Sequence, residues 1–217
     1  MTFDRTKRYR PNLNEVAYEE IKNMILVGEL VQGERVLLDK MAERMNLSIT
    51  PVREALNKLA QEDLIQMTPR TSYQVVRLDQ DDIKDILDIR ELLEVFALRS
   101  AGDGLRNFPV EGMKALISKS YSSDNYMEFI EADLLLHRTI ISIAKNRKLQ
   151  KLFDLIYNGI RILAIPSAQV PGRIEKSNQE HLALLKEIGE GNIEKAVEHL
   201  SNHIRQVKAL LLKTILV

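Results

Sequence analysis

The chain has 217 residues, 45% of them apolar and 29% charged, which is enough apolar material for one or two folded domains. Lys+Arg and Asp+Glu both number 31, so the net charge is zero, which excludes a broadly basic nucleic-acid coat and an acidic tail. The lack of Cys excludes disulfides, a thiol nucleophile and thiolate-bound metals. The sequence shows neither a signal peptide nor an apolar run of roughly 18 residues, so a cytoplasmic protein with no membrane partner is expected.

The first part of the chain predicts three helices and a small hairpin. Helices are expected over about 12–28, over 39–45 and from 50 onward. Thr50 is a good N-cap and Pro51 suits the first helical position, which places the start of the third helix there. Two β-prone runs, 64–67 and 73–76, flank the turn 68–72. This order of elements is typical of a winged helix-turn-helix.

From Asp79 onward the periodicity is helical throughout, which predicts an all-helical bundle of about six helices. Asp79 or Asp81 is expected to cap the first helix, and Pro166 and Pro171 to bracket a loop. The expected helices span about 79–101, 110–122, 124–145, 147–165, 173–189 and 192–216. The fold class is therefore mainly α. The winged helix-turn-helix domain is expected over 1–78 and the all-helical domain over 79–217.

The segment before and inside the third helix has the chemistry of a DNA contact. The first N–H groups of a helix and its positive dipole end suit a phosphate. Ser48, Thr50 and Arg53 add hydroxyl and guanidinium donors for phosphates and base edges. The residues before the first helix form a basic arm with Arg5, Lys7, Arg8 and Arg10.

The run Ser48-Ile-Thr-Pro-Val-Arg-Glu-Ala-Leu56 resembles the GntR family of bacterial transcription regulators. The resemblance implies binding to double-stranded DNA through Ser48, Thr50, Arg53, Arg44, Lys58 and Arg70. Two positions depart from the family pattern. Ile49 stands where an Arg that contacts DNA is usual, and Ser72 stands near the usual wing Gly, so a different half-site is expected. Two alternatives stay open: a winged helix that only binds protein, and an Arg53 that pairs with Glu54 or Glu62.

All four histidines lie in the second part of the chain. Asp133 and His137 are four residues apart on one apolar helical stripe, while His181 and His203 belong to stripes on two other helices. A buried carboxylate is costly without a partner, and a metal ion is one such partner. One Asp and three His suit Zn²⁺, Ni²⁺, Mn²⁺ or Fe²⁺. The spacing also allows two alternatives, a buried pair of Asp133 and His137 and a rival site at His199 and His203.

The second part resembles the helical effector domain of the FadR branch, called FCD. The matching features are Ile89-Arg-Glu-Leu-Leu-Glu94, Asp133-Leu-Leu-Leu-His137, Asn146, Glu180-His181, Gly191 and His203. The resemblance implies that Asp133, His137, His181 and His203 hold the metal, and that a small organic acid binds nearby. Candidate partners for its carboxylate are Arg90, Asn146 and Arg161. The alternative for Arg90 is an ion pair within the bundle, to Glu94 or Asp133.

These features predict a homodimeric transcription regulator that binds a pseudo-palindromic operator. An effector that prefers one arrangement of the bundle would change the affinity for DNA through linkage, and relief of repression is the expected direction. An enzyme is not expected, although a metal-dependent hydrolase or lyase using the His/Asp set remains an alternative.

Overall fold

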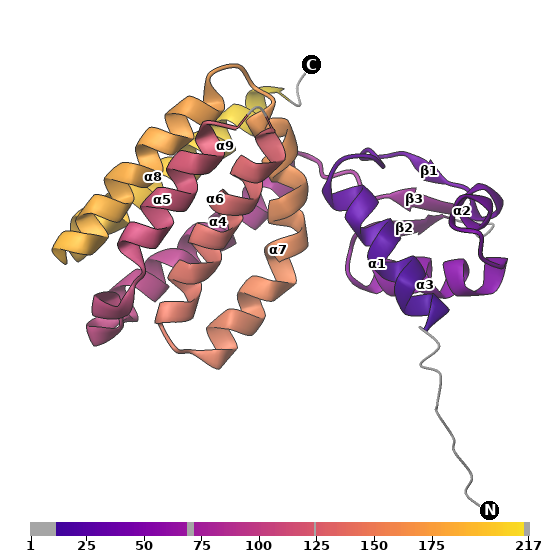
Figure 1. The fold of residues 1–217 in the computed structure, drawn as a ribbon, viewed down its shortest axis with the longest axis horizontal. Helices are drawn as coiled ribbons and strands as arrows, with labels where there is room; N and C mark the ends of the chain where they lie inside the picture. Colours follow the sequence, from indigo (N-terminus) through magenta and orange to yellow (C-terminus); the bar gives the residue numbers. More distant parts are fainter. Residues whose placement is uncertain (1–11, 69–71, 124, 215–217) are drawn as a thin grey trace, which may run out of the picture. The chain divides into compact units, whose positions relative to one another are not determined.

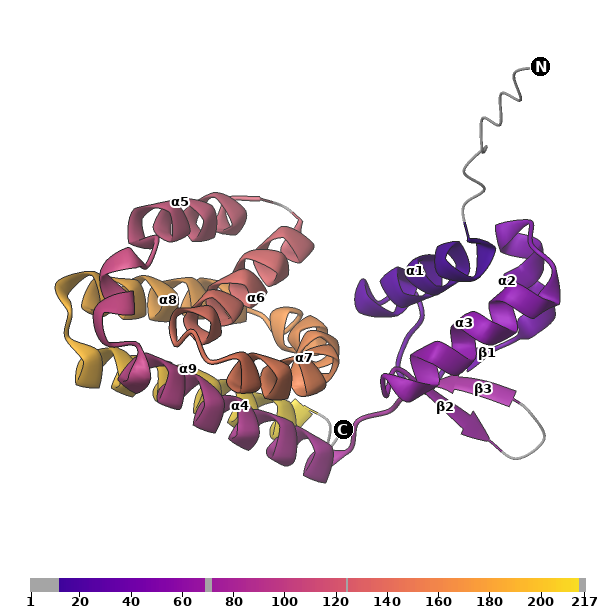
Figure 2. The ribbon, with the colours of Figure 1, turned by 90° about the horizontal axis from the view of Figure 1, so that it is seen from below.

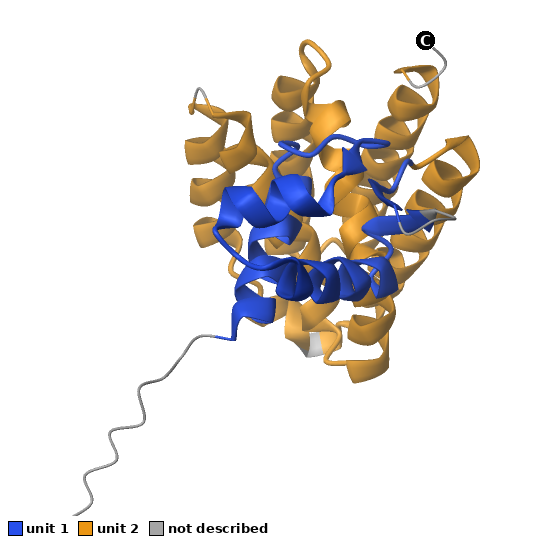
Figure 3. Cartoon of the chain, turned by 90° about the vertical axis from the view of Figure 1, so that its right-hand side faces the viewer, with its two compact units in different colours: residues 1–77 blue, residues 78–217 orange. Residues whose placement is uncertain are grey.

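The computed structural model describes residues 12–68, 72–123 and 125–214. The chain divides into two compact units, residues 1–77 and 78–217 (Figure 3). This division lies one residue from the boundary expected between residues 78 and 79. None of the described helices is long and apolar enough to cross a membrane.

The first unit contains three helices, α1 (Leu13–Leu26), α2 (Leu38–Met45) and α3 (Ile49–Gln61). Asn12 caps α1, because its side-chain oxygen accepts a hydrogen bond from the backbone N–H of Asn14. α1 packs along α3 (Figure 2). The inner face expected for the third helix is confirmed, since its members are buried: Val52, Ala55, Leu56 and Leu59.

The start of α3 differs from the prediction by two residues. The N-cap is Ser48, which has an extended backbone, and Thr50 already lies in the first turn. Pro51 is the third helical residue instead of the first. Both positions tolerate proline, because the first four N–H groups of a helix have no partner within the helix. The earlier start places Ile49 and Thr50 on the exposed first turn.

A three-stranded sheet completes the first unit. Its strands are β1 (Arg35–Val36), β2 (Ile65–Thr68) and β3 (Ser72–Val75). The order is β1-β3-β2 with antiparallel pairing, and Gln66 lies opposite Gln74 in the hairpin. The hairpin confirms the predicted wing. The sequence analysis missed β1, because two residues are too few to show alternation.

The second unit is a bundle of six α-helices and one 3₁₀ helix within the described residues. α4 (Gln80–Ser100) is capped by Asp79, and Asp82 reciprocates by accepting from the Asp79 backbone N–H. The remaining elements are η1 (Gly102–Asn107), α5 (Val110–Tyr121), α6 (Tyr126–Ile143), α7 (Arg147–Ala168), α8 (Arg173–Glu190) and α9 (Ile193–Thr214). α9 packs along both α4 and α8, and α6 lies against α4, α5 and α7 (Figures 1 and 2).

α7 is longer than predicted. The helix continues through Pro166 to Ala168, whereas the sequence analysis ended it at residue 165. A proline inside a helix removes a single backbone donor, and packing can offset that loss. The extra turn brings Ser167, which is buried, and Ala168 to the wall of a cavity in the bundle.

Candidate metal centre and nucleic-acid interface

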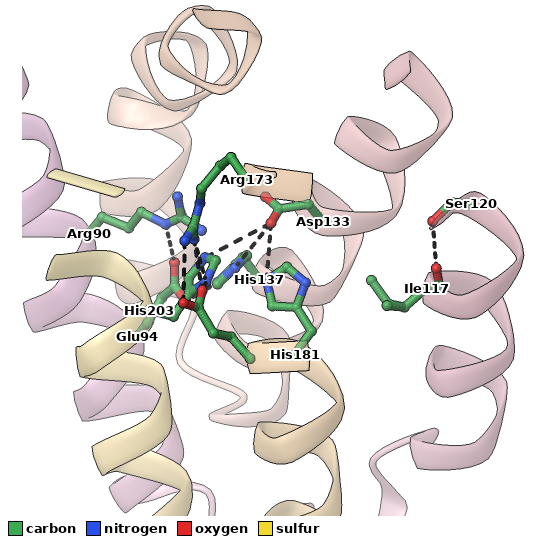
Figure 4. Close-up of polar contacts among 10 residues, drawn as sticks. Arg90, Glu94, Ile117, Ser120, Asp133, His137, Arg173, His181 and His203 are labelled. Carbon is green, nitrogen blue, oxygen red and sulfur yellow. Dashed lines mark hydrogen bonds and ion pairs between the residues drawn. The ribbon is translucent and has the colours of Figure 1, made fainter. Parts of the chain in front are cut away.

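Four side chains from three helices meet inside the second unit (Figure 4). Asp133 and His137 lie on α6, His181 on α8 and His203 on α9. Each offers one ligand atom, and these atoms lie within 4.8 Å of one another. Asp133 Oδ1 lies 3.1 Å from Nε2 of His181, 3.8 Å from that of His137 and 4.0 Å from that of His203. The predicted residues are therefore brought together, with all three imidazoles buried.

The donor atoms of this cluster fit a divalent transition metal. Nε2 of His137 is buried without a hydrogen-bond partner among the described residues, and Nε2 of His181 is buried with only Asp133 Oδ1 beside it, at 3.1 Å. A buried polar atom without a partner is costly, on the order of 1–3 kcal/mol. One carboxylate oxygen and three imidazole nitrogens form a ligand set used by Zn²⁺ and neighbouring metals. An ion held by these four residues would bind the lone pairs of these buried Nε2 atoms.

In two of the histidines, a glutamate contacts Nδ1, the ring nitrogen on the other side from the candidate ligand atom Nε2. Glu94 on α4 contacts Nδ1 of His137, and Glu180 on α8 lies 2.8 Å from Nδ1 of His203. Carboxylates in this position fix the tautomer of a metal-ligating histidine, because the Nδ1 atom keeps its proton and the Nε2 atom is left free. Both contacts therefore direct Nε2 toward Asp133.

The carboxylates around the cluster are held ionised. Burial raises the pKa of Asp133, but the nearby His137, His181 and Arg90 hold it well below its usual value. Burial also raises the pKa of Glu180, but hydrogen bonds from His203 and Arg173 bring it to about 2. Ionised carboxylates are the form that a cation requires.

Two of the imidazoles are held neutral. Burial lowers the pKa of His181, which the nearby Asp133 offsets only in part. Burial lowers the pKa of His203 well below its usual value, and its closeness to His181 adds to the effect, because two protonated imidazoles would repel each other. Neutral imidazoles can offer the lone pair that a metal binds. The surroundings of His181 and His203 thus favour the neutral form that a metal can bind.

A small cavity of about 30 Å³ adjoins the cluster. One water occupies about 10–15 Å³ on the same measure. Its polar lining includes Arg90, Asp133, Arg173 and His203, and apolar residues of α4, α6, α7, α8 and α9 complete the wall. Nη2 of Arg90 and Nε of Arg173 are buried without hydrogen-bond partners among the described residues. Two cationic groups therefore offer free donors beside the candidate metal ligands.

The three predicted effector residues have different surroundings. Arg90 lines the cavity, and its Nε also donates to Glu94 at 2.8 Å, so the expected ion pair within the bundle exists as well. Asn146 does not line the cavity; it caps α7 by accepting from two backbone N–H groups. Arg161 does not line it either, and forms an ion pair with Glu131 at 2.5 Å.

Sequence reasoning missed three residues of this region, Glu94 and Glu180 as partners of histidines and Arg173 at the cavity. Arg173 had a signal, because it lies eight residues before His181, on the same side of a helix. His199 lies four residues before His203 but is not part of the cluster, so the structure does not form the rival pair.

The start of α3 presents the predicted contact residues for DNA. Ser48, Thr50 and Arg53 are exposed. Arg53 has no ion pair within the described residues. Its two expected partners bind elsewhere, Glu54 to Asn14 and Glu62 to Lys22. The guanidinium group of Arg53 is thus available for a ligand.

Two other predicted contact residues have partners in the first unit. Arg44 pairs with Glu29, and Lys58 lies 3.3 Å from Glu15 and 3.5 Å from the ring centre of Tyr18. Exposed pairs of this kind contribute about 0–1 kcal/mol, so a phosphate can displace them. Arg70 and the basic arm of Arg5, Lys7, Arg8 and Arg10 lie outside the described residues.

Both units match known family models. A winged helix followed by a helical bundle with a histidine cluster defines a class of two-domain transcription regulators. Residues 13–75 match the bacterial regulatory proteins of the gntR family, and residues 85–206 match the FCD domain. The chain belongs to the GntR family of DNA-binding transcription regulators, in the branch that carries an FCD domain. The predicted family is confirmed.

Relatives of the chain cover most of its length. The HTH-type transcriptional regulator YdhC of Bacillus subtilis is 24% identical over 86% of this chain and 85% of that protein. The HTH-type transcriptional repressor NanR of Escherichia coli is 26% identical over 92% of this chain and 84% of that protein. The structure of E. coli McbR/YncC matches with a TM-score of 0.75 at 19% identity, covering 95% of this chain and all of that one, which supports the fold.

The FCD domain of the regulator TM0439 has been solved both metal-free and bound to Zn²⁺. It is 25% identical and covers 64% of this chain and 97% of that one, with TM-scores of 0.59 and 0.56. The matched families and named relatives are transcriptional regulators and not enzymes. The comparisons therefore support a regulator and give no support to a metal-dependent hydrolase or lyase.

Proposed function

We propose that this regulator binds its operator as a homodimer, and that a small carboxylate held beside a divalent metal ion sets the affinity. The observation that carries the proposal is the buried cluster of Asp133, His137, His181 and His203, whose ligand atoms lie within 4.8 Å of one another beside two cavity arginines. These four residues would hold the ion. When bound, the ion supplies positive charge that attracts a carboxylate.

Arg90 and Arg173 are the proposed partners of the effector. Both line the cavity, both are buried, and each has an unpartnered donor. A guanidinium group binds a carboxylate with directional, charge-assisted hydrogen bonds. The cavity of about 30 Å³ is far below the several hundred Å³ of a typical ligand site, so binding requires its walls to move. That movement gives the ligand a preference for one arrangement of the bundle.

The DNA end of the proposal rests on α3. Ser48, Thr50 and Arg53 lie at its exposed start, where backbone N–H groups face outward. In a homodimer two such helices reach successive major grooves, so the operator is expected to be pseudo-palindromic. The names of several relatives, including NanR, describe repressors, which supports repression relieved by the effector.

The test combines DNA binding with metal analysis. Fluorescence anisotropy compares DNA from the promoter beside the gene for this protein with scrambled DNA across a salt series. We expect a preference of roughly a thousandfold for the promoter DNA. Metal analysis of the purified protein is expected to give one divalent ion per chain. Equal binding to both DNAs would contradict the operator assignment, and a chain that takes up no metal would contradict the metal centre.

A further inference from the structure

A buried glutamate on α4 joins the cavity to a candidate metal ligand. One oxygen of Glu94 accepts a hydrogen bond from Arg90 Nε at 2.8 Å, and the other contacts Nδ1 of His137. All three side chains are buried, and Glu94 is completely so. Figure 4 shows Arg90, Glu94 and His137 joined in this order. A single carboxylate therefore satisfies both a cavity cation and a histidine of the cluster.

A second set of hydrogen bonds of the same kind links α8 to α9. Glu180 Oε2 lies 2.8 Å from Arg173 Nη2 and 2.8 Å from His203 Nδ1. Arg173 Nη1 adds a contact of 3.3 Å to the other oxygen. Glu180 again lies between an arginine and a histidine, and Arg173 Nη2 also lies 3.3 Å from His203 Nδ1. Both arginines line the same cavity.

We propose that Glu94 and Glu180 are positioning residues that couple anion binding in the cavity to the strength of the metal centre. This inference rests on the proposed function, because it needs both the metal and the anion. An anion bound to Arg90 and Arg173 neutralises the guanidinium groups, so each glutamate interacts more strongly with its imidazole. A stronger carboxylate partner makes an imidazole a better metal ligand. By reciprocity, the metal tightens anion binding by the same factor.

The third histidine of the cluster provides an internal comparison. Nδ1 of His181 is buried and has no hydrogen-bond partner among the described residues. Its ring packs beside Phe129, with 6.1 Å between the ring centres. No carboxylate therefore tunes this imidazole through Nδ1, whereas His137 and His203 each have one.

The first experiment measures Zn²⁺ affinity of the full chain by competition with a chromophoric chelator. The variants are Glu94→Gln and Glu180→Gln. The control is Glu131→Gln, since Glu131 also pairs with an arginine but contacts no histidine in the described structure. We expect each test variant to bind Zn²⁺ about 10–100-fold more weakly, and the control to match the unsubstituted chain. Equal affinities in all four proteins would overturn the coupling and leave the metal site standing.

The second experiment repeats the measurement with acetate as the anion. Acetate is expected to tighten Zn²⁺ binding in the unsubstituted chain and in Glu131→Gln, and to do so less in the two test variants. The same acetate effect in all four proteins would overturn the proposal, because direct attraction between anion and metal would then explain it. A chain that binds no Zn²⁺ would overturn the proposed metal centre and this inference together.

A third measurement needs no substitution and so does not depend on the variants folding. Proton–nitrogen NMR of the Zn²⁺-loaded chain reports the Nδ1 proton of each imidazole. The protons of His137 and His203 are expected far downfield, because carboxylates accept them. The Nδ1 proton of His181 is expected at an ordinary shift. Similar Nδ1 proton shifts for all three histidines would overturn the proposal that carboxylates accept hydrogen bonds from His137 and His203 alone.

Discussion

At the scale of single residues, chemistry here depends on which side chains keep a free polar atom. Arg53 in α3 has no ion pair within the described part of the chain, whereas Lys58 in the same helix contacts both Glu15 and Tyr18. In the bundle, His181 and Arg173 have buried atoms without partners. Such atoms identify the positions where a ligand has the most to contribute.

Arg53→Ala is expected to abolish the preference for operator DNA while leaving fold and dimer intact. Loss of a base contact costs about 1–3 kcal/mol of discrimination, and the proposed homodimer loses this contact in both of its α3 helices. The matched control is Arg147→Ala, which removes the same charge from an exposed position in the second unit. Anisotropy with operator and scrambled DNA measures the effect. An operator affinity unchanged by Arg53→Ala would remove this residue from the recognition surface.

His181→Ala is expected to lower the metal content of the purified protein, because His181 offers a ligand atom to the cluster. His199→Ala serves as the control, since His199 lies on α9 but is not part of the cluster. Elemental analysis after equilibration with Zn²⁺ gives the metal content per chain. A full equivalent retained by His181→Ala would exclude this residue from the site.

Asn146→Ala separates stability from effector binding. Its side chain accepts hydrogen bonds from the N–H groups of Lys148 and Leu149, and loss of such a cap costs about 1 kcal/mol. Because Asn146 does not line the cavity, we expect the affinity for acetate to stay unchanged. Denaturant unfolding and acetate titration of the Zn²⁺-loaded chain measure the two effects. A large loss of acetate affinity with normal stability would restore Asn146 as an effector residue.

Helical spacing alone predicts only those contacts of the site that join residues of the same helix. Asp133 and His137 are neighbours on one helix, so their meeting follows from the period alone. The resemblance then identified His181 and His203. The contacts of Glu94 and Glu180 with histidines join side chains 43 and 23 residues apart. They depend on how whole helices pack, which a pattern along the chain does not contain.

At the scale of elements, the helices were predicted well because each has a long apolar stripe and a good start or stop signal. Asp79 caps α4 as expected, and Gly191 ends α8 in the left-handed conformation. Errors arose where the local signal was short or misleading. The two residues of β1 carry no pattern, and Pro166 suggested an end that packing overrides.

Two glycines in the bundle should respond oppositely to alanine. A Cβ at Gly104 would lie 2.8 Å from the carbonyl oxygen of Ile143, so Gly104→Ala forces backbone to move and should destabilise by about 1–3 kcal/mol. Gly112 lies in α5 with open space around it, and Gly112→Ala should stabilise by about 0.5–1 kcal/mol. Thermal unfolding of both variants checks the sign. Equal shifts would show that the close approach of η1 to α6 is not maintained.

At the scale of the whole molecule, regulation requires that ligand binding inside the bundle changes the affinity for DNA. In the proposed function the ligand prefers one arrangement of the bundle, and the same preference appears as a change in operator affinity. The coupling acts in both directions, so operator DNA must also change the affinity for the ligand. This reciprocity gives a test that needs no knowledge of the natural effector.

Metal and anion together are expected to change operator affinity by about 5- to 150-fold. Anisotropy compares the chelator-treated chain, the Zn²⁺-loaded chain and the Zn²⁺-loaded chain with acetate. Scrambled DNA is the control, because non-specific phosphate contacts should respond much less. Identical operator affinities in the three states would show that metal and anion binding do not affect DNA binding, which contradicts the linkage.

The small volume of the cavity also affects how fast the regulator can respond. A space of about 30 Å³ admits a ligand only after the walls have opened. The observed binding rate should therefore level off at high ligand concentration, at the rate of opening, instead of rising in proportion. A regulator with such a delay does not respond to a brief rise in ligand concentration. It responds only when the ligand is present for longer than the opening time.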